Sequence, residues 1–203
     1  MKSSEWLREH AADPFVRRAR AEGWRSRAVF KLQEIDERER LLRPGQVCID
    51  LGAAPGAWSQ YARRRVGRAG RVVASDLLPL EPLAGVDFVL GDFREEAVAT
   101  AILARLPDGA ADVVLSDMAP NLSGIDAVDQ PRALHLAELA LELAGRALKP
   151  RGSALIKVFQ GSGFQEFVAG ARKRFAAVKL MKPGASRGRS PELYLLARHR
   201  LLV

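Results

Sequence analysis

Apolar positions along the chain follow two alternating patterns, short continuous runs and longer segments with helical spacing. The short runs predict strands over residues 47–51, 71–75, 86–90, 113–116, 154–159 and 193–197. The helical segments between them cover residues 26–42, 58–66, 95–104, 131–148 and 163–175. Strands that alternate with helices predict an α/β fold, in which helices cover both faces of a largely parallel sheet.

The length of the chain suits one main domain. Its 203 residues are 48% hydrophobic, which is enough for one buried core but little for two. We expect this domain to cover residues 26–203 and a basic segment, residues 1–25, to precede it. Ligands of parallel sheets bind at the carboxyl ends of the strands, so we expect the functional site there.

Net charge restricts the class of partner. The chain has 32 Lys and Arg residues against 24 Asp and Glu residues, a formal charge of +8. This excess favours a polyanion, either nucleic acid or an acidic membrane surface. No apolar run is long enough to span a membrane, and the first residues do not resemble a signal peptide. We therefore expect a cytoplasmic protein with no membrane partner.

Cysteine content bears on disulfides and metals. Cys48 is the only cysteine, so the chain cannot form an internal disulfide, and a metal site built from cysteines is disfavoured. Cys48 lies within the first apolar run, where we expect it to pack in the core. We expect no bound metal.

The basic N-terminal segment, residues 1–25, combines cations with aromatic residues. These are Arg8, Arg17, Arg18, Arg20 and Arg25, interleaved with Trp6, Phe15 and Trp24. The composition suits contacts with RNA phosphates and stacking on bases. A solvated helical extension has the same pattern, so both interpretations stay open.

A turn of small residues follows the first predicted strand, with the sequence Asp50-Leu51-Gly52-Ala53-Ala54-Pro55-Gly56. Small residues let the backbone approach a ligand closely at a strand end. The glycines lack the G-x-G-x-x-G spacing of dinucleotide sites, and the G-K-[ST] sequence of a P-loop is absent. A cofactor bound through its pyrophosphate is therefore disfavoured.

Acidic residues follow the next two predicted strands, Asp76 after the second and Asp92 after the third. The Asp76 carboxylate suits the ribose hydroxyls of an adenosine cofactor, because it accepts two hydrogen bonds and repels phosphate. Either aspartate alone is equally consistent with a turn or helix cap. Their occurrence at successive strand ends favours a ligand site.

Six motifs make the chain resemble the class I S-adenosylmethionine methyltransferases, and more narrowly the FtsJ/RrmJ family of ribosomal RNA methyltransferases. They are SRAVFKLQEI, DLGAAPGAWSQY, SDLLPLEPLAGVDFVLGDF, SDMAPNLSGIDAVDQPRA, IKVFQG and SRGRSPELYLLA, and they extend from about Arg25 to Ala197. The resemblance implies a Rossmann-like class I S-adenosylmethionine-dependent methyltransferase fold and S-adenosyl-L-methionine as cofactor.

The resemblance also implies roles for particular residues around the cofactor. The implied cofactor-binding residues are Gly52, Gly56, Trp58, Asp76, Asp92 and Asp117. By the family's pattern, Asp76 holds the ribose, Asp92 meets the adenine region and Asp117 lies near the methyl donor. Ala57 departs from the pattern, because close relatives often have glycine there and alanine requires a negative φ.

The family carries a catalytic Lys-Asp-Lys-Glu tetrad, and all four positions match here as Lys31, Asp117, Lys157 and Glu192. Lys157 lies in an otherwise apolar run, so its ammonium group is either buried and paired or emerges at the strand end. Lys31 borders the apolar face of its predicted helix. A lysine whose stem lies along apolar surface and whose ammonium group reaches solvent also occupies such a position.

The reaction that this resemblance implies is attack of a ribose 2'-oxygen on a sulfonium methyl group. Our candidate base is Lys157; a lysine with an ordinary pKa of ~10.4 needs burial or a neighbouring cation to act near neutral pH. Lys31 would supply that cation and stabilise developing negative charge. Asp117 would orient Lys157, and Glu192 would fix the cluster or receive the ribose.

Other methyl acceptors fit the sequence less well. Transfer to C5 of a pyrimidine needs an attacking cysteine, and Cys48 precedes the turn. Enzymes that methylate the adenine amino group typically have an aromatic residue in the motif after the fourth strand, and Asp117-Met118-Ala119-Pro120 has none.

The resemblance therefore implies 2'-O-methylation of a uridine in bacterial 23S ribosomal RNA, in the assembled large ribosomal subunit, by a monomer. Its partners would be ribosomal RNA and the large subunit. The alternatives are a 2'-O-methyltransferase of transfer RNA or a cap, a non-catalytic ribosome-assembly RNA-binding protein, and a nicotinamide oxidoreductase. The match at all four tetrad positions favours an enzyme.

Overall fold

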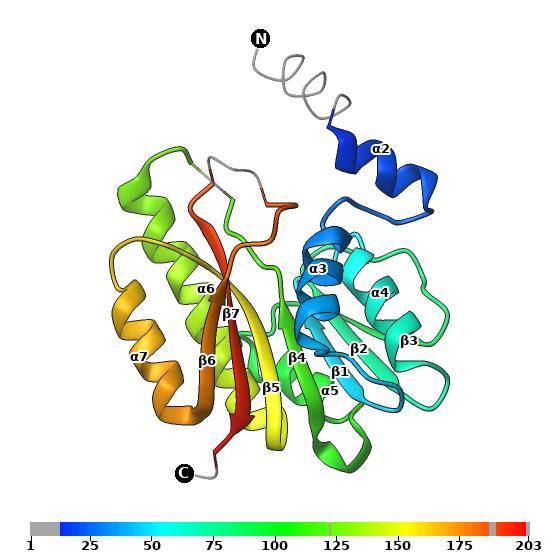
Figure 1. Cartoon of the computed structure of the whole chain (residues 1–203). Helices are drawn as coiled ribbons and strands as arrows, with labels where there is room; N and C mark the ends of the chain where they lie inside the picture. The colour runs from blue at the N-terminus through cyan, green and yellow to red at the C-terminus, as the bar shows by residue number, and fades with distance from the viewer. Residues whose placement is uncertain (1–12, 122, 187–189, 202–203) are drawn as a thin grey trace.

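The computed structural model describes residues 13–121, 123–186 and 190–201. Its centre is a seven-stranded sheet (Figure 1). The strands are β1 (Val47–Leu51), β2 (Arg71–Asp76), β3 (Val86–Leu90), β4 (Ala111–Ser116), β5 (Leu148–Phe159), β6 (Phe175–Met181) and β7 (Glu192–Arg200). The α-helices are α2 (Pro14–Ala21), α3 (Val29–Glu39), α4 (Ala57–Val66), α5 (Glu96–Leu103), α6 (Asp126–Ala147) and α7 (Phe164–Arg174).

The strands lie in the order β3-β2-β1-β4-β5-β7-β6. Neighbours from β3 to β5 are parallel, whereas β7 pairs antiparallel with both β5 and β6. The predicted α/β fold with a largely parallel sheet is confirmed, and each of the six predicted strands is present.

Two elements differ from the prediction. The apolar run of β6 was not predicted as a strand, because it directly follows a helical segment and periodicity alone does not separate the two. In the structure this edge strand is buried only at its end residues, Phe175 and Met181. Helix α6 begins at Asp126, before the expected start at residue 131. The Asp129 carboxylate accepts hydrogen bonds from the backbone N–H groups of Ser123 and Gly124, which holds this additional first turn in place.

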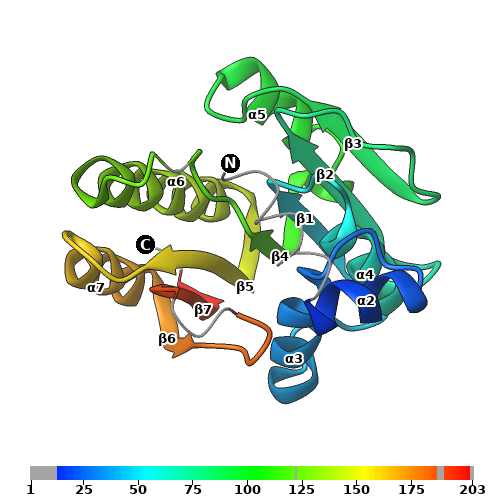
Figure 2. The ribbon, with the colours of Figure 1, turned by 90° about the horizontal axis from the view of Figure 1, so that it is seen from above.

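Helices cover the two faces of the sheet (Figure 2), and each face has its own apolar core. Helices α5, α6 and α7 pack on one face, and α3 and α4 pack on the other. Successive residues of β1 alternate between these cores, with Val47 and Ile49 in the first and Cys48 in the second. Cys48 is fully buried, as predicted. Within the described ranges, no helix is long and apolar enough to cross a membrane.

The described part of the N-terminal segment packs against the domain. The Phe15 ring contacts Phe30 of α3, and the Trp24 ring contacts Tyr61 of α4. Both aromatic residues therefore join the core under α3 and α4, where they are partly buried. Two further members of the segment, which lie outside the described residues, are Trp6 and Arg8.

The direction of the strand order changes beside β1, which has β2 on one side and β4 on the other. In parallel sheets, ligands bind in the crevice outside the carboxyl ends of the strands at such a point. Leu51 pairs with Ser75 on β2 and with Ser116 on β4. The residues that follow these three strands therefore meet at one edge of the sheet.

Candidate active site

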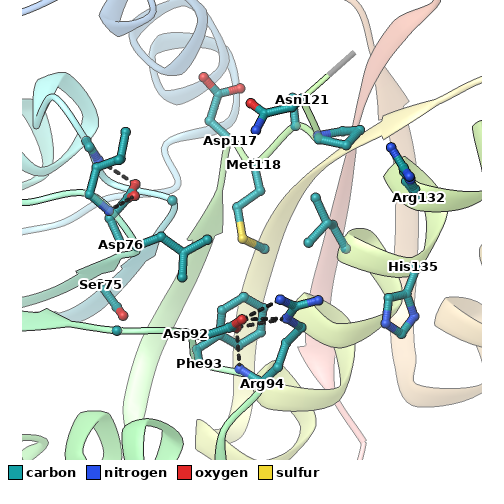
Figure 3. A pocket seen from close by; sticks show the side chains of 18 residues that line it. Ser75, Asp76, Asp92, Phe93, Arg94, Asp117, Met118, Asn121, Arg132 and His135 are labelled. Atoms are coloured by element: carbon teal, nitrogen blue, oxygen red, sulfur yellow. Dashed lines mark hydrogen bonds and ion pairs between the residues drawn. The ribbon is translucent and has the colours of Figure 1, made fainter. Parts of the chain in front are cut away.

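A pocket of about 610 Å³ lies at the carboxyl ends of β1 to β4 (Figure 3). Its walls come from the loops after these strands and from α6. The predicted site residues that line it are Gly52, Asp76, Asp92 and Asp117. The structure therefore brings together the acidic residues at the carboxyl ends of β2, β3 and β4.

Gly52 allows the chain after β1 to turn tightly. It has a φ of +73°, and a Cβ at this position would lie 2.4 Å from Met118 Cγ. The N–H groups of Gly52 and Ala53 both donate to the Ser75 carbonyl, at 2.9 and 3.1 Å. Any larger residue at position 52 would displace Met118 from the pocket wall.

Gly56 caps α4 with a φ of +108° and does not line the pocket. The next residue, Ala57, begins the helix and is buried. Its helical conformation has the negative φ that alanine requires, so the departure from the family's pattern fits this turn.

Trp58 lies in the core between α3 and β7 and does not line the pocket. Its indole Nε1 donates to the Ala28 carbonyl at 2.8 Å, and its ring packs against Tyr194 with centroids 5.8 Å apart. The structure therefore does not bring Trp58 together with the pocket residues. Its ring lies in the core, between the start of α3 and Tyr194 of β7.

Asp76 holds the turn after β1 as well as the pocket wall. One carboxylate oxygen accepts a hydrogen bond from Ala54 N–H and the other from Leu78 N–H, both at 2.8 Å. Each oxygen keeps a further lone pair for a ligand. The carboxylate is thus fixed in orientation at the pocket wall (Figure 3).

Asp92 is paired with Arg94, which the sequence did not single out. Arg94 Nε lies 2.9 and 2.8 Å from the two carboxylate oxygens, and the Arg94 backbone N–H adds a further hydrogen bond at 3.0 Å. The hydrogen bonds from the guanidinium hold the pKa of Asp92 below its usual value. The carboxylate therefore stays charged and faces the pocket together with its cation.

Strand register brings the tetrad residues to one face of the sheet. Ser116 pairs with Ile156, so the residues that follow, Asp117 and Lys157, are neighbours. On the other edge of β5, Lys157 pairs with Tyr194 of β7. Side chains alternate along strands, so these groups share the face that α3 covers.

All four tetrad residues make direct contact. Lys157 Nζ lies 3.1 Å from Asp117 Oδ1 and 4.0 Å from Glu192 Oε2, and it donates to the Asp117 carbonyl at 2.7 Å. Lys31 Nζ lies 2.7 Å from Glu192 Oε1 and 3.9 Å from Asp117 Oδ1. The exposed fractions of the four side chains lie between 7% for Lys157 and 15% for Asp117. Lys157 is thus buried and paired, and Lys31 points into the cluster.

Two further residues complete the cluster, and sequence reasoning missed both. The fully buried Tyr194 hydroxyl donates to Asp117 Oδ1 at 2.5 Å, and the Ser186 hydroxyl donates to Glu192 Oε1 at 2.8 Å. Burial, together with the charges of Asp117 and Glu192, raises the pKa of Tyr194 well above its usual value. The spacing of Glu192 and Tyr194 was a usable signal, since residues two apart on a strand share a face.

The segment that carries Ser186 is tied to the N-terminal part of the chain. The Arg27 guanidinium donates to the Ala185 carbonyl and pairs with the Asp13 carboxylate. Asp13 is also the N-cap of α2. One arginine therefore connects the start of α2 with a residue adjoining the tetrad.

Asp50 is a buried carboxylate beneath the pocket. Its Oδ2 accepts a hydrogen bond from the Ser59 hydroxyl at 2.5 Å, and its Oδ1 has no hydrogen-bond partner among the described residues. Burial, with the nearby negative charges of Asp117 and Asp76, raises the pKa of Asp50 from 3.8 to about 7. The charged form is therefore costly in the folded protein.

The arginines of the N-terminal segment have different surroundings. Arg17 and Arg20 are exposed on α2. Arg18 forms an ion pair with Glu22, and Arg25 donates to three backbone carbonyls in the loops that follow β1 and β2. Arg25 therefore holds loops together. Within residues 13–25, Arg17 and Arg20 are the exposed arginines of this set for which the structure shows no ion pair.

Metal-binding side chains do not gather in the part of the chain that the structure describes, where no three His, Cys, Asp or Glu residues lie close enough to hold an ion. The site itself contains paired lysines and carboxylates beside an acidic pocket.

Comparisons with known proteins point to one family. The family model described as FtsJ-like methyltransferase matches residues 24–200. The chain is 59% identical over 194 residues to the ribosomal RNA large subunit methyltransferase E of Stenotrophomonas maltophilia, covering 96% of this chain and 92% of the relative. It is 58% identical, with the same coverage, to the protein of that name from Xanthomonas oryzae pv. oryzae.

A solved structure supports the fold alone. A Plasmodium falciparum protein described as a ribosomal RNA methyltransferase matches with a TM-score of 0.74 at 24% sequence identity, covering 88% of this chain and 99% of the other. The arrangement of sheet and helices is that of a Rossmann-like class I methyltransferase.

Proposed function

The chain belongs to the FtsJ-like methyltransferase family, and on this premise we propose that it methylates a ribose 2'-hydroxyl of large-subunit ribosomal RNA with S-adenosylmethionine as methyl donor. The observation that carries the proposal is the buried cluster of Lys31, Asp117, Lys157 and Glu192 beside the pocket. The relatives at 58–59% identity are named as large-subunit ribosomal RNA methyltransferases, which supports the substrate class.

The pocket residues fit an adenosine cofactor. Asp76 presents a fixed carboxylate with free lone pairs, as two ribose hydroxyls require. Leu77 and Leu78 line the pocket although each is 64% exposed, and Phe93 adds an aromatic ring. Such apolar surface suits the faces of a purine. Gly52 leaves no room for a side chain, so its backbone can approach the ligand.

The tetrad residues supply proton removal and positioning. When bound, the cofactor supplies an electrophilic methyl group. Lys157, in its neutral form, takes the proton from the ribose hydroxyl at Nζ, and its contacts with the Asp117 side chain and carbonyl fix the direction of its lone pair. Lys31 stabilises the negative charge that develops on the ribose oxygen. Glu192 holds Lys31 in place at 2.7 Å.

Within the substrate class, we propose a uridine of 23S ribosomal RNA in the assembled large subunit, acted on by a monomer. The excess of cations over acidic residues supports a large polyanionic substrate. Arg17 and Arg20, exposed on α2, offer contacts with its phosphates.

The deciding experiment compares substrates side by side. Purified protein and labelled S-adenosylmethionine are incubated with large subunits from a strain lacking the gene, with free ribosomal RNA, with transfer RNA and with capped RNA. Label confined to a 2'-O-methyluridine of 23S ribosomal RNA is the expected result. Label on transfer RNA or the cap would overturn the substrate, and binding of ribosomal particles without any transfer would indicate a non-catalytic assembly protein.

A further inference from the structure

The α6 wall of the pocket has no part in the cofactor contacts proposed above. Arg132, His135 and Leu136 form this wall, and Asn121 from the loop after β4 also lines the pocket. In the close-up, Asn121 and Arg132 are drawn on the side of Asp117 that faces away from Asp76 (Figure 3). The pocket therefore extends past the ribose-binding carboxylate to a separate set of polar side chains.

The two arginines that line the pocket differ in their pairing. Arg94 is held by both oxygens of Asp92. Arg132 is exposed, and among the described residues no ion pair or hydrogen bond engages its guanidinium. The nearest acidic residue on its own helix, Asp129, directs its carboxylate at Ser123 and Gly124 instead. Arg132 thus presents its N–H donors to the pocket with no direct ion pair among the described residues, and the Asp129 carboxylate interacts with its charge only at longer range.

The position of Arg132 is fixed by its helix. Gln130 accepts a hydrogen bond from the Ser162 N–H, which ties α6 to the loop after β5. Leu134 packs so closely on Gly163 that a Cβ there would lie 2.4 Å from it. Arg132 lies between these two anchored residues, so its Cα is held although its side chain is exposed.

An anion is the ligand that suits this wall. A guanidinium binds phosphate oxygens in a bidentate manner, and the Asn121 amide and His135 imidazole add further hydrogen-bonding groups. The pocket also contains the negative charges of Asp76, Asp92 and Asp117, which repel RNA phosphates. A cation on the α6 wall offsets this repulsion for a phosphodiester held near Asp117.

We propose that Arg132, with Asn121 and His135, forms a subsite for an RNA phosphodiester that flanks the ribose presented to Lys157. The proposal rests on the proposed function for the identity of the reacting ribose, whereas the phosphate contact itself is independent of transfer. Arg132 is then the residue that keeps the target strand in register with the tetrad.

The test measures RNA binding and cofactor binding separately in the full chain. Binding of a labelled ribosomal RNA fragment is titrated between about 50 and 200 mM salt, and binding of S-adenosylhomocysteine is followed by calorimetry. For Arg132→Ala we expect RNA affinity to fall roughly tenfold or more, and the slope of log K against log salt to fall by ~0.7–0.9. Arg132→Lys should keep most of the slope but lose part of the affinity.

The matched control is Arg172→Ala, which removes the same charge from the exposed last turn of α7. That turn precedes β6 and lies at the opposite end of the sheet from the pocket. Equal losses for Arg172→Ala and Arg132→Ala, or no loss for Arg132→Ala, would overturn the subsite. A weakened S-adenosylhomocysteine affinity in Arg132→Ala would assign the arginine to the cofactor carboxylate instead.

The two proposals fail in distinguishable ways. Absence of methyl transfer by the wild-type protein, with a reduced salt slope in Arg132→Ala, would refute the reaction and leave the phosphate contact standing. Normal methyl transfer to ribosomal RNA, with an unchanged slope in Arg132→Ala, would refute the subsite and leave the reaction standing.

Discussion

Replacement of Asp50 by asparagine should change how the free energy of unfolding depends on pH. In the folded protein the pKa of Asp50 is raised to about 7, against 3.8 for an ordinary aspartate. The folded state therefore binds this proton more tightly than the unfolded state. The resulting stabilisation is complete below about pH 4 and is lost as pH rises through about 7. At ~1.36 kcal/mol per pKa unit, the total is about 4 kcal/mol.

Between about pH 5 and about pH 8.5, a range suited to unfolding measurements, the contribution of Asp50 to the free energy of unfolding should fall by about 3 kcal/mol. Asp50→Asn keeps an oxygen for Ser59 and cannot ionise, so its stability should lack this component. Urea unfolding of both proteins across this range gives the difference directly, and Asp108→Asn, in an exposed turn, is the control. Stability curves of wild type and Asp50→Asn that run parallel with pH would refute the reasoning.

Substitutions at three positions test the site itself. Lys157→Ala should lower the single-turnover methylation rate by ~10²–10⁴-fold with cofactor affinity nearly unchanged, and Lys157→Arg should not restore it, because a guanidinium stays protonated; near-wild-type rates would remove Lys157 as the base. Asp76→Asn should weaken S-adenosylmethionine binding roughly tenfold by calorimetry, since a charge-assisted hydrogen bond is lost; unchanged affinity in a folded variant would contradict its role. Ser186→Ala should slow single turnover by about five- to tenfold, because Glu192 loses a hydrogen bond worth ~1 kcal/mol, while the RNA concentration at half-maximal rate stays constant; a shift in that concentration alone would place Ser186 in substrate binding instead.

Strand positions were predictable because buried parallel strands are continuous apolar runs, and acidic residues directly after such runs mark the ligand edge of the sheet. Asp76 and Asp92 were found in this way, and both line the pocket. The edge strand β6 was not found although its sequence is largely apolar, because a short apolar run that directly follows a helix cannot be distinguished from the end of that helix by periodicity alone. Trp58 shows another limit, because proximity to a glycine turn in sequence does not determine which way an indole points.

The side chains that hydrogen-bond to the predicted site residues were harder to predict than the site residues themselves. Arg94 pairs with Asp92, two positions earlier. The sequence did not predict this pair, because an exposed arginine in a loop adopts many side-chain conformations and need not contact a nearby aspartate. Ser186 reaches Glu192 through a loop whose path depends on contacts with distant parts of the chain, including Arg27. Tyr194 was within reach of strand periodicity, since it lies two residues after Glu192. Contacts that depend on loop paths leave no periodic pattern in a sequence.

The place of β7 between β5 and β6 has a consequence for synthesis of the protein on the ribosome. This strand follows the other described elements in the sequence, yet it occupies an interior position of the sheet and supplies Glu192 and Tyr194 to the tetrad cluster. Until it is translated, β5 has an open edge, and Lys31 and Lys157 face only one of their two carboxylates. Unpaired edges promote association between nascent chains. Translation stalled before β7 should therefore yield an aggregation-prone chain that lacks a working active site, so the active site assembles only with the arrival of this strand.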